Sequence, residues 1–169
     1  MDLFDAIDQR ASVRELKPAE VAEADLTRIL EAGRRAPSGH NRQPFEFIVV
    51  RDRQTIAALA AAQACIGDVS LVICVAAEPE KSKFWLEDVS AATTQMLLAI
   101  HALGYASVWI EGTLLRKEQE LKPLFALPEA MRLVVALPIG KAVNPVVPHE
   151  KRPLTDMVHW ERYQRKTGP

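Results

Sequence analysis

Two short stretches of the chain gather side chains that bind polar ligands. The first is RASVR, residues 10–14. If this stretch is extended, Arg10, Ser12 and Arg14 lie on one side of it and the apolar residues between them on the other, because side chains alternate along extended backbone. Two guanidiniums and one hydroxyl on one side suit a phosphate or the carbonyl-rich edge of a ring. A solvated basic face after a helix has the same composition, so the stretch alone leaves both interpretations open.

The second stretch is RRAPSGHNRQPF, residues 34–45. Its hydroxyl, amide and guanidinium groups follow a helical pattern and precede an apolar run, and Gly39 allows the backbone between them to bend sharply. A loop held between rigid elements can present such groups to a planar ligand with polar edges. An ordinary polar connection with a proline at each end would have the same composition.

Composition limits the classes of protein to which the chain can belong. A length of 169 residues, 49% of them hydrophobic, predicts one folded domain rather than a disordered chain. The formal net charge of −1 and the pI of about 6.4 give no basic surface for nucleic acid or an anionic membrane. The residues after Met1 are acidic and the apolar stretches are interrupted by polar residues. We therefore expect neither a secretory signal nor a membrane span, and a cytoplasmic protein.

Several familiar catalytic patterns are missing from the sequence. There is no Walker A sequence and no GxGxxG, which argues against a Rossmann dinucleotide site. HExxH and GxSxG are absent as well, so neither a zinc protease nor a hydrolase nucleophile is indicated. Cys65 and Cys74 lie in apolar surroundings without CxxC spacing, which favours buried thiols over a disulfide or a metal pair. We expect no metal site.

The remaining pattern predicts the elements that must position the two stretches. Helical periodicity predicts helices near residues 3–10, 22–36, 55–64, 88–103 and 116–125, the fourth apolar nearly all round and therefore buried. Apolar, β-rich runs predict strands at residues 45–50, 71–77, 105–110 and 133–137. Gly112 follows the third of these strands, where a glycine lets a ligand approach backbone N–H groups closely.

The chain changes character from Pro138 onward. Three further prolines before residue 154 keep this tail extended, while Trp160 and Tyr163 need something to cover them. An extended arm wrapped on a partner subunit explains both features. The sequence thus predicts a single domain of residues 1–169, in which residues 138–169 form the arm.

Together and in this order, the motifs resemble the nitroreductase family of flavin mononucleotide (FMN) enzymes, especially its short members. The resemblance covers nearly all of the chain. It rests on RASVR, on the RRAPSGHNRQPF loop, on the buried helix leading into VWIEG at residues 108–112, and on KRPLTDMVHWERY from Lys151. It implies an α+β fold, a three-layer α/β/α sandwich with a mixed, largely antiparallel four- to five-stranded sheet. It also implies an extensive homodimer with the flavin at the interface and exchanged C-terminal arms, in agreement with the tail.

The resemblance further implies which residues hold the flavin. Arg10, Ser12 and Arg14 match the segment that contacts the phosphate and the ring edge, and Pro37, Ser38, Asn41 and Gln43 match the loop that lines the cofactor. Ile110, Glu111 and Gly112 match the segment against the isoalloxazine ring, with a backbone amide near the nitrogen that accepts hydride. Lys151 and Arg152 match a second phosphate clamp.

The chemistry that the resemblance implies is carried by FMN, and no catalytic side chain is expected. NADH or NADPH would give hydride to the flavin and leave. An oxidised small molecule such as a nitroaromatic, a quinone or an enone would then take electrons in the same pocket, which is a ping-pong mechanism. Two alternatives stay open: a flavin-using specialist, such as a dehalogenase or a flavin-fragmenting enzyme, and a redox-silent flavin-binding protein.

Two departures from the family pattern concern the substrate. Phe45 stands where the family commonly has tryptophan, and the connection at residues 78–87 is too short for the helical insertions that cover the substrate in longer members. The substrate is therefore the least determined of these expectations.

Overall fold

The fold is built around a three-stranded antiparallel sheet whose central strand, β3 (Leu71–Ala77), is buried along its whole length. The computed structural model describes residues 1–164. β2 (Phe45–Val50) pairs with one edge of β3 and β4 (Arg132–Ile139) with the other. β2 and β3 have the predicted bounds, because β3 is a continuous apolar run and β2 is a mainly apolar, β-rich one.

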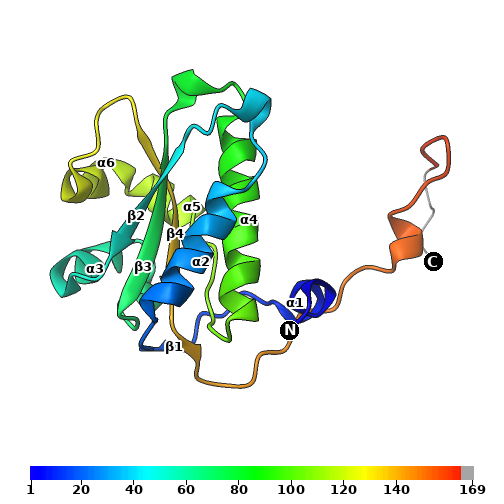
Figure 1. Cartoon of the computed structure of the whole chain (residues 1–169), viewed down its shortest axis with the longest axis horizontal. Coiled ribbons are helices and arrows are strands. Elements are labelled where there is room, and N and C mark those ends of the chain that lie inside the picture. Colours follow the sequence, from blue (N-terminus) through cyan, green and yellow to red (C-terminus); the bar gives the residue numbers. More distant parts are fainter. Residues whose placement is uncertain (165–169) are drawn as a thin grey trace.

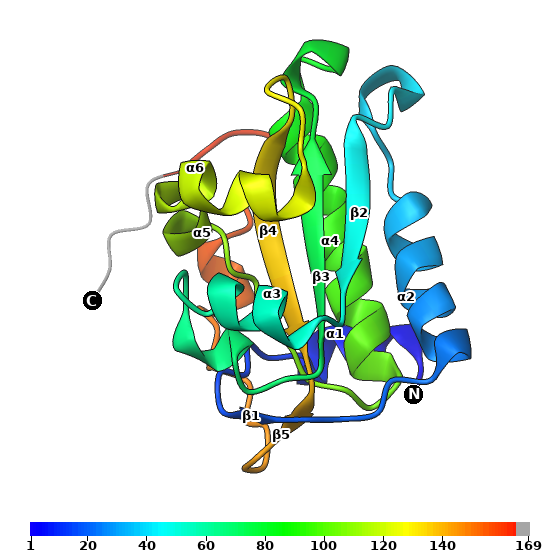
Figure 2. The ribbon, with the colours of Figure 1, turned by 90° about the vertical axis from the view of Figure 1, so that its left-hand side faces the viewer.

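Helices cover both faces of this sheet, which gives three layers (Figures 1 and 2). α2 (Glu23–Arg34) and α4 (Trp85–Ala102) lie on one face, and α3 (Arg53–Leu59), α5 (Gly112–Arg116) and α6 (Glu118–Leu121) on the other. Alternate residues of β3 therefore join different cores: Ile73 belongs to the cluster under α2 and α4, and Val72 to the cluster under α3. The predicted α+β class and layered architecture are confirmed.

The strands fall into two sheets instead of one. β1 (Leu16–Lys17) pairs antiparallel with β5 (Lys141–Ala142) as a separate two-stranded sheet. The predicted strand over residues 105–110 was wrong as a continuous element, since only two of its residues form bridges: Ala106 with Gly140, just after β4, and Ile110 with Ala136 inside β4.

Pro138 explains the interruption. In this register Val108 lies opposite Pro138, midway between the two bridges. A proline has no N–H to donate, so the pair that would join the bridges into a ladder is not formed. Pro138 itself lies inside β4, and the boundary expected for the arm therefore falls within the sheet.

The other helices differ from the prediction mainly at their ends. α1 (Leu3–Gln9) begins after Asp2, whose carboxylate accepts a hydrogen bond from the N–H of Asp5 at 2.9 Å. α4 starts three residues earlier than predicted, and the helix predicted over residues 116–125 is divided among α5, α6 and a 3-10 turn that contains Pro123. The remaining 3-10 turns are η1 (Gly39–Asn41), η2 (Ala64–Ile66), η3 (Pro79–Lys81) and η5 (Leu154–Asp156).

Beyond β5 the chain leaves the body of the molecule as an extended segment (Figure 1). We call residues 145–164 the arm; residues 165–169 of the predicted arm lie outside the described residues. Within residues 1–164, the structure contains no helix that is both long and apolar enough to cross a membrane.

Candidate functional site

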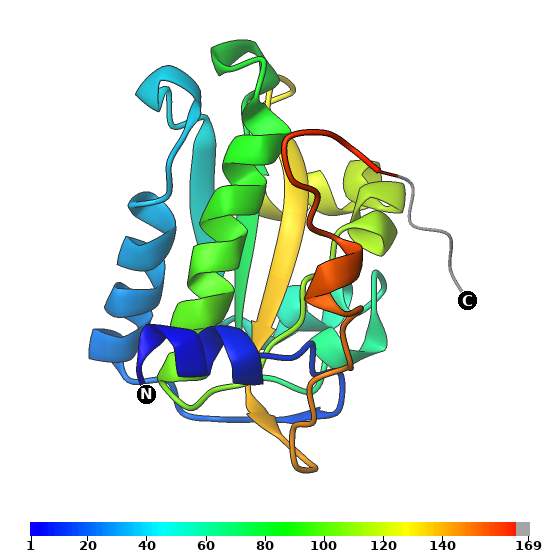
Figure 3. The same cartoon turned by 90° about the vertical axis from the view of Figure 1, so that its right-hand side faces the viewer.

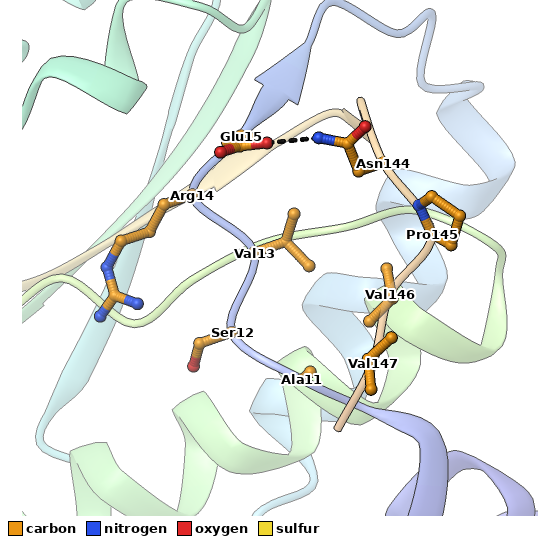
Figure 4. A pocket seen from close by; sticks show the side chains of 9 residues that line it. All are labelled: Ala11, Ser12, Val13, Arg14, Glu15, Asn144, Pro145, Val146 and Val147. Carbon is orange, nitrogen blue, oxygen red and sulfur yellow. Dashed lines mark hydrogen bonds between the residues drawn. The ribbon is translucent and has the colours of Figure 1, made fainter. Parts of the chain in front are cut away.

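The segment Arg10–Arg14 runs between α1 and β1 against the chain that bridges to β4. The N–H of Val13 donates to the carbonyl of Ser107 at 3.0 Å. Figure 4 shows Ser12 and Arg14 pointing to one side of the segment and Val13 to the other, toward Val146. This is the alternation that extended backbone predicts.

The two guanidiniums of this segment are free to bind an anion. Arg10 is half-buried and Arg14 is exposed, and neither guanidinium forms an ion pair or a hydrogen bond with another residue of the described chain. Burial lowers the pKa of His101, and the charge of Arg10 lowers it further, so this imidazole is neutral at pH 7 and leaves the positive charge to the arginines.

An open pocket of about 260 Å³ adjoins the segment and is lined by residues 11–15 and 144–147 (Figure 4). Its rim is tied together by two contacts. The amide of Asn144 donates to the carboxylate of Glu15 at 2.5 Å, and the N–H of Val143 donates to the carbonyl of Glu15 at 3.0 Å. The root of the arm is therefore fixed beside Arg10–Arg14.

The segment Ile110–Gly112 follows the chain that packs against Arg10–Arg14 and offers backbone donors of its own. Ile110 is buried and exchanges two hydrogen bonds with Ala136 of β4, at 3.1 and 2.9 Å. The next two N–H groups, of Glu111 and Gly112, donate to no atom of residues 1–164. A Cβ built on Gly112 would meet nothing within 4 Å, so the space above this backbone is open to a ligand. Trp109 donates from Nε1 to the carboxylate of Glu111 at 2.9 Å and orients it.

The loop over residues 37–43 contains strained backbone. His40, Asn41 and Gln43 have φ angles of 52°, 55° and 47°, in the left-handed region that side chains disfavour. Each such residue costs about 1–3 kcal/mol, and the cost is most often met at functional sites. Two local bonds contribute to the conformation: the hydroxyl of Ser38 accepts from the N–H of Gln43 at 3.1 Å, and Nε2 of Gln43 donates to the carbonyl of Asn41 at 3.1 Å.

Gly39 does not have the role that its sequence position suggested. The sharp bend is made by its non-glycine neighbours, and Gly39 itself has no positive φ. A Cβ at this position would lie 2.5 Å from Cδ2 of Phe84. The loop therefore needs glycine because it packs directly against the aromatic ring of Phe84, in the connection over residues 78–84.

A single chain brings only part of the predicted site together. Arg10–Arg14 adjoins the segment leading to Ile110–Gly112, at the level of α1. The loop over residues 37–43 lies at the opposite end of the sheet (Figure 3). Lys151 and Arg152 are exposed on the arm, and among residues 1–164 the guanidinium of Arg152 donates to the carbonyl of Asp156, at 3.4 Å. Within one chain, neither the 37–43 loop nor the pair Lys151 and Arg152 is gathered around Arg10.

Asp88 is a residue of this region that the sequence did not single out. It is 4% exposed, and its Oδ1 accepts from the N–H of Gly39 at 2.7 Å. In the sequence it is one acidic residue near the start of a helix, which is ordinary, because such residues favour the helix macrodipole. Asp88 and Gly39 are 49 residues apart in the chain, so no local sequence pattern indicates their contact.

Comparison with known proteins shows which family the chain resembles in sequence and structure. The model of the nitroreductase family matches residues 7–72 and 61–141. A protein of Archaeoglobus fulgidus, provisionally named NADH dehydrogenase/NAD(P)H nitroreductase, is 34% identical over 91% of this chain and 94% of its own.

Solved structures agree with this match. The crystal structure of a protein from Bacteroides thetaiotaomicron with the same provisional name has a TM-score of 0.88 at 28% identity and covers 95% of this chain and 98% of its own. An FMN-dependent nitroreductase from Clostridium difficile has a TM-score of 0.84 at 25% identity, over 95% of this chain and 99% of its own.

Proposed function

The chain belongs to the nitroreductase family, and from that membership we propose how it holds FMN and what it reduces. It is an NAD(P)H-dependent oxidoreductase, and its cofactor is FMN. The chemistry that FMN supplies when bound is hydride transfer from NADH or NADPH to an oxidised small molecule. We place nitroaromatics, quinones and enones in that class, used in ping-pong order in one pocket.

The observation that carries the assignment of residues is the pair of unpartnered donor sets. Arg10 and Arg14 present guanidiniums without an ion-pair partner in the described chain, and the N–H groups of Glu111 and Gly112 donate to no described atom. These donors suit the two ends of FMN, which carries a phosphate at one end and a ring with acceptor atoms at the other. The segment Arg10–Arg14 packs against the chain that leads to Glu111 and Gly112, because the N–H of Val13 donates to the carbonyl of Ser107.

In this proposal Arg10, Ser12 and Arg14 bind the phosphate and balance its charge. Ile110 closes the site from below as a buried side chain, while Glu111 and Gly112 direct N–H groups at the ring. No side chain acts as an acid or a base: the protein orients the ring, and the N–H groups beside it would donate hydrogen bonds to its acceptor atoms.

The residues that one chain keeps apart are supplied by a second copy. We propose a homodimer in which the loop with Pro37, Ser38, Asn41 and Gln43 of one subunit lines the flavin bound to Arg10 of the other. Its interface includes α1, where Leu3, Phe4 and Ile7 are 61%, 75% and 49% exposed, and the arm, where Leu154, Met157, Trp160 and Tyr163 are 59–80% exposed. Apolar surface of this extent on two neighbouring elements calls for cover.

The same arrangement assigns a place to the late basic pair. We propose that Lys151 and Arg152 reach the phosphate once the arm packs on the partner subunit. A cytoplasmic location and the single-domain organisation stay predictions of the sequence.

A mixed-dimer experiment tests the shared site. One variant carries Arg10→Gln and Arg14→Gln, and the other Ser38→Ala and Asn41→Ala. Each homodimer should bind FMN poorly. If sites are shared between subunits, unfolding and refolding an equal mixture regenerates one intact site in each heterodimer and restores NADPH:quinone turnover. Turnover no greater than the mean of the two variants would contradict a shared site.

Parallel double-reciprocal lines for NADPH and quinone in the wild type test the ping-pong order, and converging lines would refute it.

A further inference from the structure

Asp88 carries a buried carboxylate whose partners are hydrogen-bond donors and not cations. Oδ1 accepts from the N–H of Gly39 at 2.7 Å, and Oδ2 accepts from the hydroxyl of Ser82 at 2.9 Å. Ser82 is 3% exposed, and its oxygen also accepts from the N–H of Phe84 at 3.1 Å. Within residues 1–164, no lysine, arginine or histidine pairs with Asp88. Burying a carboxylate without a cation partner costs free energy. The hydrogen bonds that Asp88 accepts must therefore stabilise another part of the molecule by more than this cost.

These bonds join two loops that are distant in the sequence. One is the loop over residues 37–43, and the other is the connection over residues 78–84, which lies beside it at the end of the sheet (Figures 1 and 3). Two further contacts run between the same loops. The ring of Phe84 leaves no room for a Cβ at Gly39, and Nη1 of Arg42 donates to the carbonyl of Lys81 at 3.2 Å.

The strained backbone makes such an anchor necessary. Three non-glycine residues of the first loop have positive φ, so the loop would relax if nothing outside it held the conformation. Its internal bonds involve Ser38, Asn41 and Gln43 themselves. The N–H of Gly39 is the backbone group through which a buried side chain of a regular helix, α4, holds the loop from outside.

We propose that Asp88 is a positioning residue for the flavin site: it fixes the loop that presents Ser38, Asn41 and Gln43, and joins it to the 78–84 connection. The inference rests on the proposed function, which places this loop against FMN. Without the carboxylate, only a fraction of chains holds the loop in its binding conformation, and the apparent affinity for FMN falls by that fraction. The phosphate contacts of Arg10 and Arg14 are unaffected.

Asp88→Ala tests this inference against a matched control in the same chain. Asp52 is also a carboxylate with two hydrogen bonds near the start of a helix, accepting from the N–H and the hydroxyl of Thr55 at 2.8 Å each. It caps α3, on the other face of the sheet. Asp52→Ala therefore removes comparable bonds without touching the loop.

Two readouts are measured, the Kd for FMN and the rate of amide hydrogen exchange over residues 38–43. Asp88→Ala should raise the Kd about tenfold or more, since hydrogen bonds to a charged group are lost, and should speed exchange in the loop. Asp52→Ala should change neither by more than about twofold, because surface caps act on local stability alone. Asp88→Asn, which keeps one acceptor oxygen, should lie between Asp88→Ala and the wild type.

Equal FMN affinity and equal loop exchange in Asp88→Ala and Asp52→Ala would overturn the inference. If Asp88→Ala does not fold, Asp88→Asn and Ser82→Ala decide, and wild-type values for both would overturn it equally. A wild-type protein that binds no FMN would instead contradict the proposed function. The two failures are distinguishable because the second appears before any variant is made.

Discussion

Replacing Arg10 and Arg14 should weaken the binding of FMN selectively, by removing contacts to its phosphate. Neither guanidinium has an ion-pair partner in the described chain, so Arg10→Gln and Arg14→Gln break no bond within it. The free energy of unfolding of the flavin-free protein should therefore change by less than about 0.5 kcal/mol. The loss should appear in ligand binding instead.

The size of the loss follows from the contacts that are removed. A hydrogen bond to a charged group contributes about 1.5–3 kcal/mol, so each single variant should raise the Kd for FMN by about 10- to 150-fold. The double variant should lose less than the sum of the two, because both arginines act on one phosphate and interactions within one network are not additive.

Titration of the flavin-free protein with FMN and with riboflavin, followed by flavin fluorescence, measures both effects. Riboflavin has the ring but no phosphate, so its affinity should be almost the same in the wild type and in the variants. Arg34→Gln is the control: it also removes a guanidinium, but one that pairs with Glu31 at 2.6 Å on the surface of α2. The reasoning is refuted if FMN affinity is unchanged, or if riboflavin affinity falls as much as FMN affinity.

Four further predictions concern the fold, the arm and two glycines of the site. Burial opposes ionisation of Glu118, but hydrogen bonds from Arg132 and a backbone N–H outweigh it and lower its pKa. Glu118 therefore stabilises the fold above the ordinary carboxyl pKa, and this stability is lost as the pH falls through the lowered value. By urea unfolding, Glu118→Gln should cost about 3 kcal/mol at pH 7 and progressively less as the pH falls below the ordinary carboxyl pKa; a cost that does not change with pH would count against this account. Truncation after Asn144 should give a monomer or insoluble protein, and a soluble, flavin-loaded monomer in sedimentation would disprove the role of the arm. Gly112→Ala should leave the Tm unchanged, since its Cβ meets nothing within 4 Å, yet weaken FMN binding. The proposed position of the flavin ring is wrong if Gly112→Ala binds FMN normally. Gly39→Ala should lower the Tm because its Cβ clashes with Phe84.

The sheet could be predicted where the sequence carried a strong apolar run. The bounds of β2 and β3 followed directly from residues 45–50 and 71–77. β3 is apolar throughout because it is covered on both faces, and β2 is a mainly apolar, β-rich run at the edge of the sheet. The segment from Tyr105 to Ile110 has the same composition but forms only two bridges. What decides its conformation is Pro138, a residue of the neighbouring strand that no local pattern brings to it.

The sequence offers the candidate site as a set of residues, which stays a prediction, and it does not offer their arrangement. Alternation along Arg10–Arg14 is a property of the local backbone, so the side on which Ser12 and Arg14 lie could be read from the sequence. The separation of this segment from the 37–43 loop depends on the whole fold, and the part played by Asp88 depends on a contact across 49 residues. Gly39 shows the same limit: a glycine in a loop suggested a bend, and the structure shows close packing against Phe84.

The measurement that tests the central claim most directly is the visible absorption spectrum of the purified protein with FMN, recorded anaerobically before and after NADH and then NADPH. If the chain is an FMN-dependent NAD(P)H oxidoreductase, the flavin binds and at least one of the two nucleotides bleaches its absorption. A quinone added next should restore the oxidised spectrum. Flavin that binds but is bleached by neither nucleotide would contradict the proposed activity, and failure to bind FMN would contradict the site.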